Sequence, residues 1–238
     1  RELEIAPSVH GDSGLDGPEL PQPKEEALKI SAFELMAKVV EESDEKITLV
    51  PTGPLTNIAI FLLSYPHLKS KIERISLMGG SAIGGNWTAS AEFNILVDPE
   101  AADIVFKSGI PITMSGLDVT HKAQVYPEDI EKIKNQGGKV AVMVGELLEF
   151  FIKFHKEICG WEFAPLHDPC AVAWLINPDM FTSKKLNVQI DIDGEHTTGC
   201  TVTDFLNRFK LEPNTDVLLD VDRHQFVDML IDAVNKYH

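Results

Sequence analysis

The stretch that decides the fold runs from Lys71 to Val119 and reads KIERISLMGGSAIGGNWTASAEFNILVDPEAADIVFKSGIPITMSGLDV. It begins with an apolar run that is typical of a buried strand, and it ends with a second run of the same kind. Between the two runs, Asp98-Pro99 is a helix start signal and Gly109 is a stop signal. A strand, a helix and a strand in this order predict a parallel β-α-β unit.

The same alternation continues on both sides of this unit. Apolar runs that predict strands occupy residues 46–54, 71–80, 110–119 and 215–222. Helical patterns cover residues 32–43, 55–66, 98–109, 138–157, 167–181 and 223–237. A hairpin pattern covers residues 185–193 and 200–206. We predict an α/β fold with a mostly parallel sheet and an added antiparallel hairpin, forming a single domain over residues 1–238.

The composition restricts the kind of partner. The 238 residues carry 37 acidic and 21 basic side chains, which gives a formal net charge of -16. Such an acidic surface disfavours nucleic acid and anionic membranes. No apolar run approaches the roughly 20 residues that span a bilayer. The three cysteines are widely spaced and suit a reducing compartment. We expect a cytoplasmic protein whose partner is a small molecule.

The chain begins at Arg1 in a loop-like stretch that is rich in proline and glycine. A polar, proline-containing start of this kind does not nucleate a domain. This start is what we expect of the middle of a domain.

Ligands of parallel α/β sheets bind at the carboxyl ends of the strands. The loop that follows the strand at 71–80 offers Asn86, Glu92 and Asn94, with Phe93 between the last two. Amides and a carboxylate supply the mixed donors and acceptors that a polyhydroxylated ligand needs. A simple glycine-rich turn remains the alternative, and neither GxGxxG nor a Walker loop occurs there.

Two other loops hold candidate oxygen ligands. In VPTGPLTN, the hydroxyl or carbonyl of Thr52 suits a hard cation, although a strand-to-helix turn capped by Thr56 explains the same residues. In VHGDSGLDGP, His10 and two aspartates lie among glycines, as in a lid over a site or in an ordinary surface turn. The spacing of an EF-hand is absent.

The pair His167-Asp168 precedes an almost wholly apolar helix. Asp168 is expected at the N-cap and Pro169 at the first helical position. The positive end of the helix dipole favours a neutral imidazole and an ionised carboxylate at this place. Asp98-Pro99 has the same helix start without a preceding histidine, so capping explains Asp168 and leaves His167 unexplained.

Six blocks together resemble the inosine-uridine nucleoside hydrolases, and within them the bacterial pyrimidine-preferring ribonucleoside hydrolases. The likeness is colinear and covers essentially the whole chain. The blocks are HGDSGLDG (10–17), PTGPLTN (51–57), LMGG (77–80), GNWTASAEFNILVDPEAA (85–102), GLDVTH (116–121) and APLHDPCAVAWL (164–175).

The resemblance implies hydrolysis of the N-glycosidic bond of a ribonucleoside to free base and ribose. It also implies a doubly wound (Rossmann-like) parallel α/β sheet with added hairpins. It further implies one Ca²⁺ at the strand ends that binds a water and the ribose 2′ and 3′ hydroxyls, and a homo-oligomer, often a tetramer.

The resemblance also assigns roles to single residues. It makes Asp168 a calcium ligand that touches the ribose, and it makes Thr52 a ligand through its backbone carbonyl. His167 is a candidate general acid, and His10 is a second histidine on the base side. Ribose contacts are expected from Met78, Asn86, Glu92, Phe93 and Asn94.

One block of the family has no counterpart here, so the resemblance implies a domain that is N-terminally truncated and lacks its first β-α-β unit. An aspartate-rich motif at the end of the family's first strand supplies two calcium carboxylates and the base that activates water. Without it the calcium site of this chain is expected to be incomplete, since Ca²⁺ takes about 6–8 oxygens. The alternative function is therefore a non-catalytic remnant that binds ribose or nucleoside or forms oligomers. A serine hydrolase is disfavoured, because no GxSxG elbow occurs.

Overall fold

The computed structural model describes residues 5–6, 9, 11 and 13–237, so His10 lies outside the described residues. The chain forms two compact units. The first contains residues 27–120 and 167–220, and the second contains the described residues before Ala27 together with residues 121–166 and 221–237. Among the described residues, no helix is long and apolar enough to cross a membrane.

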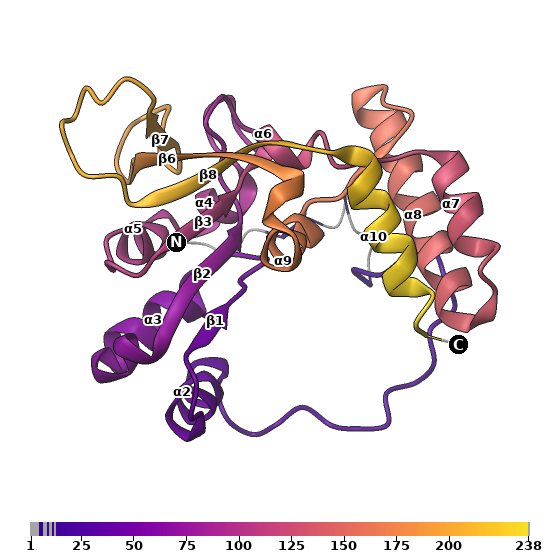
Figure 1. The fold of residues 1–238 in the computed structure, drawn as a ribbon, viewed down its shortest axis with the longest axis horizontal. Helices are drawn as coiled ribbons and strands as arrows, with labels where there is room; N and C mark the ends of the chain where they lie inside the picture. The colour runs from indigo at the N-terminus through magenta and orange to yellow at the C-terminus, as the bar shows by residue number, and fades with distance from the viewer. Residues whose placement is uncertain (1–4, 7–8, 10, 12, 238) are drawn as a thin grey trace. The chain divides into compact units, whose positions relative to one another are not determined.

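A six-stranded sheet organises the first unit (Figure 1). Its strands are β1 Ile47–Leu49, β2 Ile72–Met78, β3 Ile112–Ser115, β6 Phe181–Ile190, β7 Thr201–Asp204 and β8 Thr215–Val221. They lie in the order β1-β2-β3-β8-β6-β7. The pairs β1–β2, β2–β3 and β3–β8 are parallel, and β6–β7 is an antiparallel hairpin. The predicted mostly parallel sheet with an added hairpin is therefore confirmed.

Six α-helices and two 3₁₀ helices in the described part of the first unit connect these strands. They are α2 Ala32–Glu42, α3 Thr56–Ser64, η1 Pro66–Lys71, α4 Phe93–Val97, α5 Pro99–Phe106, α6 Leu117–Thr120, α9 Asp168–Ile176 and η2 Pro178–Met180. Local signals begin several of them. At α2, Ser31 and Glu34 form a capping box, in which the Glu34 carboxylate accepts from the Ser31 N–H at 2.9 Å.

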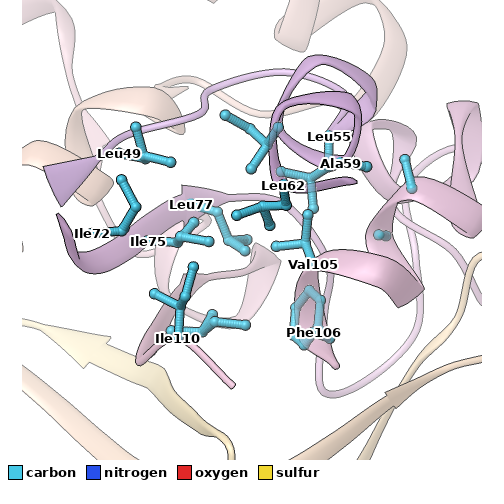
Figure 2. Close-up of a cluster of buried hydrophobic side chains, with 14 of the residues drawn as sticks. Leu49, Leu55, Ala59, Leu62, Ile72, Ile75, Leu77, Val105, Phe106 and Ile110 are labelled. Atoms are coloured by element: carbon cyan, nitrogen blue, oxygen red, sulfur yellow. The ribbon is translucent and has the colours of Figure 1, made fainter. Parts of the chain in front are cut away.

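One face of the sheet is apolar. Ile75 and Leu77 of β2 are fully buried and belong to a core that includes Leu62 of α3 and Val105 and Phe106 of α5 (Figure 2). Successive side chains of a strand point to opposite faces, so Arg74, Ser76 and Met78 face the other way.

That opposite face is polar and carries α9. Arg74 donates to Thr113 Oγ1 at 2.8 Å and pairs with Asp216 at 3.0 Å, and its guanidinium lies 4.8 Å from the centre of the Trp174 ring. Ser76 Oγ donates to the Ala171 carbonyl at 2.7 Å. Trp174 of α9 therefore lies over Arg74, and Ala171 lies over Ser76. The next turn of α9 toward its start brings Asp168 to the level of Met78, at the carboxyl end of β2.

A lysine from η1 donates hydrogen bonds to the open carbonyl groups at the end of α2. Lys71 Nζ donates to the carbonyls of Val40, Glu41 and Ser43 at 3.2, 2.8 and 2.9 Å. These carbonyls have no partner within the helix, because the last turn of any helix leaves its acceptors open. Lys71 thus links the end of α2 to the segment that leads into β2.

We expect Lys71→Met to lower the thermal midpoint by roughly 3 to 6 °C, because a charged hydrogen bond is worth about 1.5–3 kcal/mol. Lys69→Met, in the same 3₁₀ helix, is the matched control. Circular dichroism melting of the two variants checks the prediction. Equal midpoints would show that Lys71 does not stabilise α2.

The second unit is mostly helical. It contains α7 Pro127–Lys134, α8 Gly138–Cys159, α10 Arg223–Val234 and the antiparallel pair β4 Gln124–Val125 and β5 Ala164–Pro165. Arg223 connects them: its Nε donates to the Gln124 carbonyl at 2.9 Å, its guanidinium pairs with Asp129, and it lies 4.9 Å from the centre of the Tyr126 ring. The sequence analysis did not anticipate α7, β4 or β5.

Candidate active site

The carboxyl end of β2 turns sharply through two glycines. β2 ends at Met78, which is paired with Ser115 of β3. Gly80 follows with a φ of +76°, and a Cβ at this position would come within 2.8 Å of Thr201 Cγ2. Glycine is therefore required both by the backbone conformation and by the close approach of β7.

Glu92 is a buried carboxylate that connects this turn to α4. Its side chain accepts from the N–H groups of Gly80 at 2.9 Å, Asn94 at 3.0 Å and Ile95 at 3.3 Å. Only 3% of Glu92 is exposed. Burial raises the pKa of this carboxyl to about 7, against the opposing effect of the three N–H donors, and the nearby charge of Asp168 raises it further.

Asn94 lies beside Met78. Its amide nitrogen donates to the Met78 carbonyl at 3.1 Å and to the Met78 sulfur at 3.2 Å. Both residues are buried. Because the amide nitrogen is engaged in this way, the carbonyl oxygen of Asn94 is left to accept a hydrogen bond from a ligand, and no described residue donates to it.

The segment between the glycine turn and α4 folds back on itself. Asn86 Oδ1 accepts from the Phe93 N–H at 3.0 Å, and the rings of Phe93 and Trp87 pack in a T-shaped arrangement with centroids 4.8 Å apart. Asn86 is exposed and Phe93 is partly buried. Both residues are thus held at the start of α4, next to Glu92.

Asp168 does not cap α9, so the predicted N-cap at this residue is wrong. The N-cap is His167, whose backbone is already near the helical conformation and carries Asp168 into the first turn. No side-chain cap bond forms there, whereas Asp98 does cap α5 by accepting from the Ala101 N–H at 3.0 Å. The Asp168 carboxylate stays accessible, yet the protein atoms around it remove enough water to raise its pKa to about 6.

His167 is held by a residue from another element. Its Nδ1 lies 2.8 Å from Oγ1 of Thr120, the last residue of α6. Thr120 is fully buried, and His167 is partly exposed. The sequence analysis did not single out Thr120, although it lies inside the quoted block GLDVTH.

The structure brings most of the predicted site residues to one edge of the sheet. Hydrogen bonds connect Glu92 and Asn94 to the turn after Met78, and Asp168 acts on Glu92 through its charge. The loop that contains Thr52 reaches the same edge, because the Met78 N–H donates to the Pro51 carbonyl at 3.0 Å. The placement of His10 lies outside the described residues.

The described site offers oxygen donors of the type that a hard cation prefers, but fewer of them than such a cation needs. The Asp168 carboxylate and the Thr52 carbonyl are hard oxygen ligands, and Glu92 already accepts three N–H groups. Across the described part of the chain, no group of three or more His, Cys, Asp or Glu side chains could hold a metal ion. The described residues alone therefore do not complete the 6–8 oxygens, approximately, that Ca²⁺ takes.

Comparison with known proteins identifies the family to which the chain belongs. Residues 1–228 match the inosine-uridine preferring nucleoside hydrolase family. The chain belongs to this family. It is 56% identical over 238 residues to the pyrimidine-specific ribonucleoside hydrolase RihA of Photobacterium profundum, covering all of the chain and 77% of that relative. It is 53% identical to RihA of Escherichia coli (strain K12), again over the whole chain and over 76% of the relative.

Solved structures of nucleoside hydrolases share the fold. A purine-preferring ribonucleoside hydrolase from Gardnerella vaginalis superposes with a TM-score of 0.90 at 33% identity, covering 100% of this chain and 76% of that one. A plant nucleoside hydrolase, PpNRh1, gives a TM-score of 0.89 at 29% identity and covers 98% and 75%. The family resemblance and the expected hydrolase fold are therefore confirmed, and the chain is a nucleoside hydrolase.

Proposed function

We propose that this nucleoside hydrolase cleaves the N-glycosidic bond of pyrimidine ribonucleosides such as uridine and cytidine, and releases the free base and ribose. The observation that carries the proposal is the cluster of Glu92, Asn94 and Asp168 at the carboxyl end of β2. The pyrimidine preference is supported by the relatives at 53% and 56% identity, which are named pyrimidine-specific. A non-catalytic role finds no support among these relatives.

The ribose is proposed to bind against α4 and the end of β2. Glu92 and the carbonyl of Asn94 accept hydrogen bonds from ribose hydroxyls, and Asn86 contributes a further amide. Because the pKa of Glu92 is about 7, its carboxyl can also donate when it is protonated. Met78 and Phe93 line the apolar side of the sugar.

The reaction breaks one bond, and the two fragments develop opposite charges. The bond between ribose C1′ and the base nitrogen breaks, and its electron pair leaves with the base. The ribosyl group becomes oxocarbenium-like, as in glycoside hydrolysis. Water then adds to C1′ and loses a proton, while the base gains one. The carboxylates of Glu92 and Asp168 stabilise the positive charge. His167 is proposed as the general acid toward the base, with His10 as a second histidine on that side.

Nucleoside hydrolases are in general metal-dependent. We propose Ca²⁺ as the metal, with Asp168 and the Thr52 carbonyl among its ligands, because both are hard oxygen donors at the same sheet edge. When bound, such an ion would orient the ribose hydroxyls and acidify water.

The assembly and the compartment are proposed on separate grounds. The three cysteines are free, which supports the cytoplasm. The end of the β6–β7 hairpin exposes Phe205, Leu206 and Phe209, which supports a homo-oligomer, with a tetramer as the proposed state. We further propose that residues 1–238 form one hydrolase domain, since the family match spans both units.

A reducing-sugar assay with uridine, cytidine and inosine tests the proposed activity. We expect ribose release to be fastest from uridine and cytidine, and to be lost on chelation and restored by added Ca²⁺. Faster release from inosine would contradict the pyrimidine preference. Absence of release by folded chain in the presence of Ca²⁺ would contradict the proposed activity of this chain.

A further inference from the structure

The side chain of Thr120 binds one ring nitrogen of His167. The hydroxyl of Thr120 and Nδ1 of His167 are 2.8 Å apart, which is a good hydrogen-bond distance. Thr120 is fully buried at the end of a helix of only one turn. A valine would fill the same volume without the hydroxyl, so Thr120→Val removes the hydrogen bond alone.

The segment that carries Thr120 is tied to the loop after β2. The Leu117 N–H donates to the Gly80 carbonyl at 2.9 Å, and the carboxylate of Asp118 accepts from the Ala82 N–H at 2.6 Å. A Cβ on Gly116 would come within 2.8 Å of the Gly80 carbonyl oxygen, so the two segments are in close contact. Thr120 Oγ1 is therefore held in a fixed position relative to the turn that Glu92 also binds.

The chemistry of the partner decides which hydrogen bonds Nδ1 can make. A neutral imidazole has one N–H donor and one acceptor, and a hydroxyl can serve either nitrogen. His155 shows the contrasting case: its Nδ1 lies 2.8 Å from the Phe151 carbonyl, which can only accept, so Nδ1 of His155 carries the hydrogen. The hydroxyl of Thr120 can donate to Nδ1 of His167 or accept from it, so this hydrogen bond persists whether or not Nδ1 carries a hydrogen.

A general acid passes through two states. The protonated ring carries hydrogens on both nitrogens, so its Nδ1 donates to Thr120 Oγ1, and the ring is neutral once Nε2 has given up its proton. The Thr120 hydroxyl accepts in the first state and can rotate to accept or donate in the second. A carbonyl partner could only accept.

We propose that Thr120 is a positioning residue for the hydrolysis reaction, and that its hydroxyl holds Nδ1 of His167 so that Nε2 of the protonated ring is directed at the leaving base, to which it gives its proton while the ring becomes neutral. This rests on the proposed function, in which His167 is the general acid. Thr120 itself does not touch the reacting atoms.

The first test reads the hydrogen bond at Nδ1 directly and needs no turnover. A long-range ¹H–¹⁵N spectrum of histidine-labelled chain resolves the two ring nitrogens, and His167→Gln assigns the signals. We expect the Nδ1 signal of His167 to be the same in the wild type and in Thr120→Ser, and to shift in Thr120→Val, which lacks the hydroxyl. A Thr120→Val spectrum identical to wild type would overturn the proposal.

The second test uses the leaving group. For uridine we expect Thr120→Val to lower kcat by about 10- to 100-fold with little change in KM, because general acid catalysis is worth about 10²–10⁴-fold. Thr120→Ser should restore most of the rate. With p-nitrophenyl riboside, whose phenolate leaves without a proton, the variant should match the wild type. Equal losses on both substrates would mean a purely structural role and would overturn the proposal.

Controls separate this proposal from the proposed function. Thr215→Val removes another buried threonine hydroxyl, bonded to Asn214 at 3.0 Å, and should leave both rates and the His167 signal unchanged. If His167→Gln did not slow uridine hydrolysis, the general acid assignment would fail. If His167→Gln slowed it and Thr120→Val did not, only the role of Thr120 would be overturned.

Discussion

Asp168→Ala should reduce kcat/KM for uridine by about 100- to 1,000-fold, with no loss of thermal stability. The carboxylate makes no capping bond, and none of the described residues donates a hydrogen bond to it, so folding does not depend on it. Burial already disfavours its ionised form, as its pKa of about 6 indicates, so its removal takes no stabilising charge from the folded state near neutral pH. Steady-state kinetics and melting curves check the two halves of the prediction.

Asp98→Ala is the matched control, because the two residues occupy similar Asp-Pro sequences. Asp98 accepts from the Ala101 N–H at 3.0 Å and from the Thr56 hydroxyl at 2.5 Å. Its removal should cost about 1 kcal/mol of stability, the usual worth of a helix cap. If Asp168→Ala lowered the melting temperature as much as Asp98→Ala does, the view of Asp168 as a carboxylate reserved for ligand would be wrong.

The free energy of unfolding should fall by up to about 3 kcal/mol through Glu92 alone as the pH rises from about 4.5 to above 7, since one pKa unit corresponds to about 1.4 kcal/mol. The pKa of Glu92 is about 7 in the folded chain and near 4.5 in the unfolded chain. Below the lower value the group is protonated in both states and costs nothing. Above it the unfolded chain ionises first, so stability decreases until the folded chain ionises as well.

Urea titrations across this pH range, in the presence of a chelator, measure the effect. Glu92→Gln should remove the Glu92 share of the pH dependence and leave the smaller share of Asp168, whose pKa is raised in the same direction. Parallel curves for the wild type and Glu92→Gln would show that Glu92 ionises in the folded chain at its ordinary pKa. Glu42→Gln, at the exposed end of α2, is the control for an unburied glutamate.

The location of the site was predictable because it follows from topology. Once strands and helices alternate, the sheet is parallel, and the loops after 71–80 and 110–119 must meet at one edge. The residue types then point to a polyhydroxylated ligand, as Glu92 and Asn94 do in the structure. Neither step needs knowledge of a side-chain conformation.

What the sequence could not supply depends on single backbone angles and on burial. The sequence Asp-Pro begins both α5 and α9, yet only Asp98 is a cap, because His167 occupies the cap position of α9. The pKa of Glu92 depends on a 3% exposure that no motif encodes. The helix α7 did carry a signal, since Pro127 at its first position is followed by Glu128 and Asp129.

The polar face of the sheet also fixes the position of α9 along β2. Two contacts hold α9 in position along β2 at successive turns. The guanidinium of Arg74 lies against the Trp174 ring, and Ser76 Oγ donates to the Ala171 carbonyl. A slide of α9 by one turn, about 5.4 Å, would break both contacts at once. Residues that do not touch the substrate therefore set how far Asp168 extends past the carboxyl end of β2. A change of side-chain size at Trp174 would change that distance and with it the geometry of the active site.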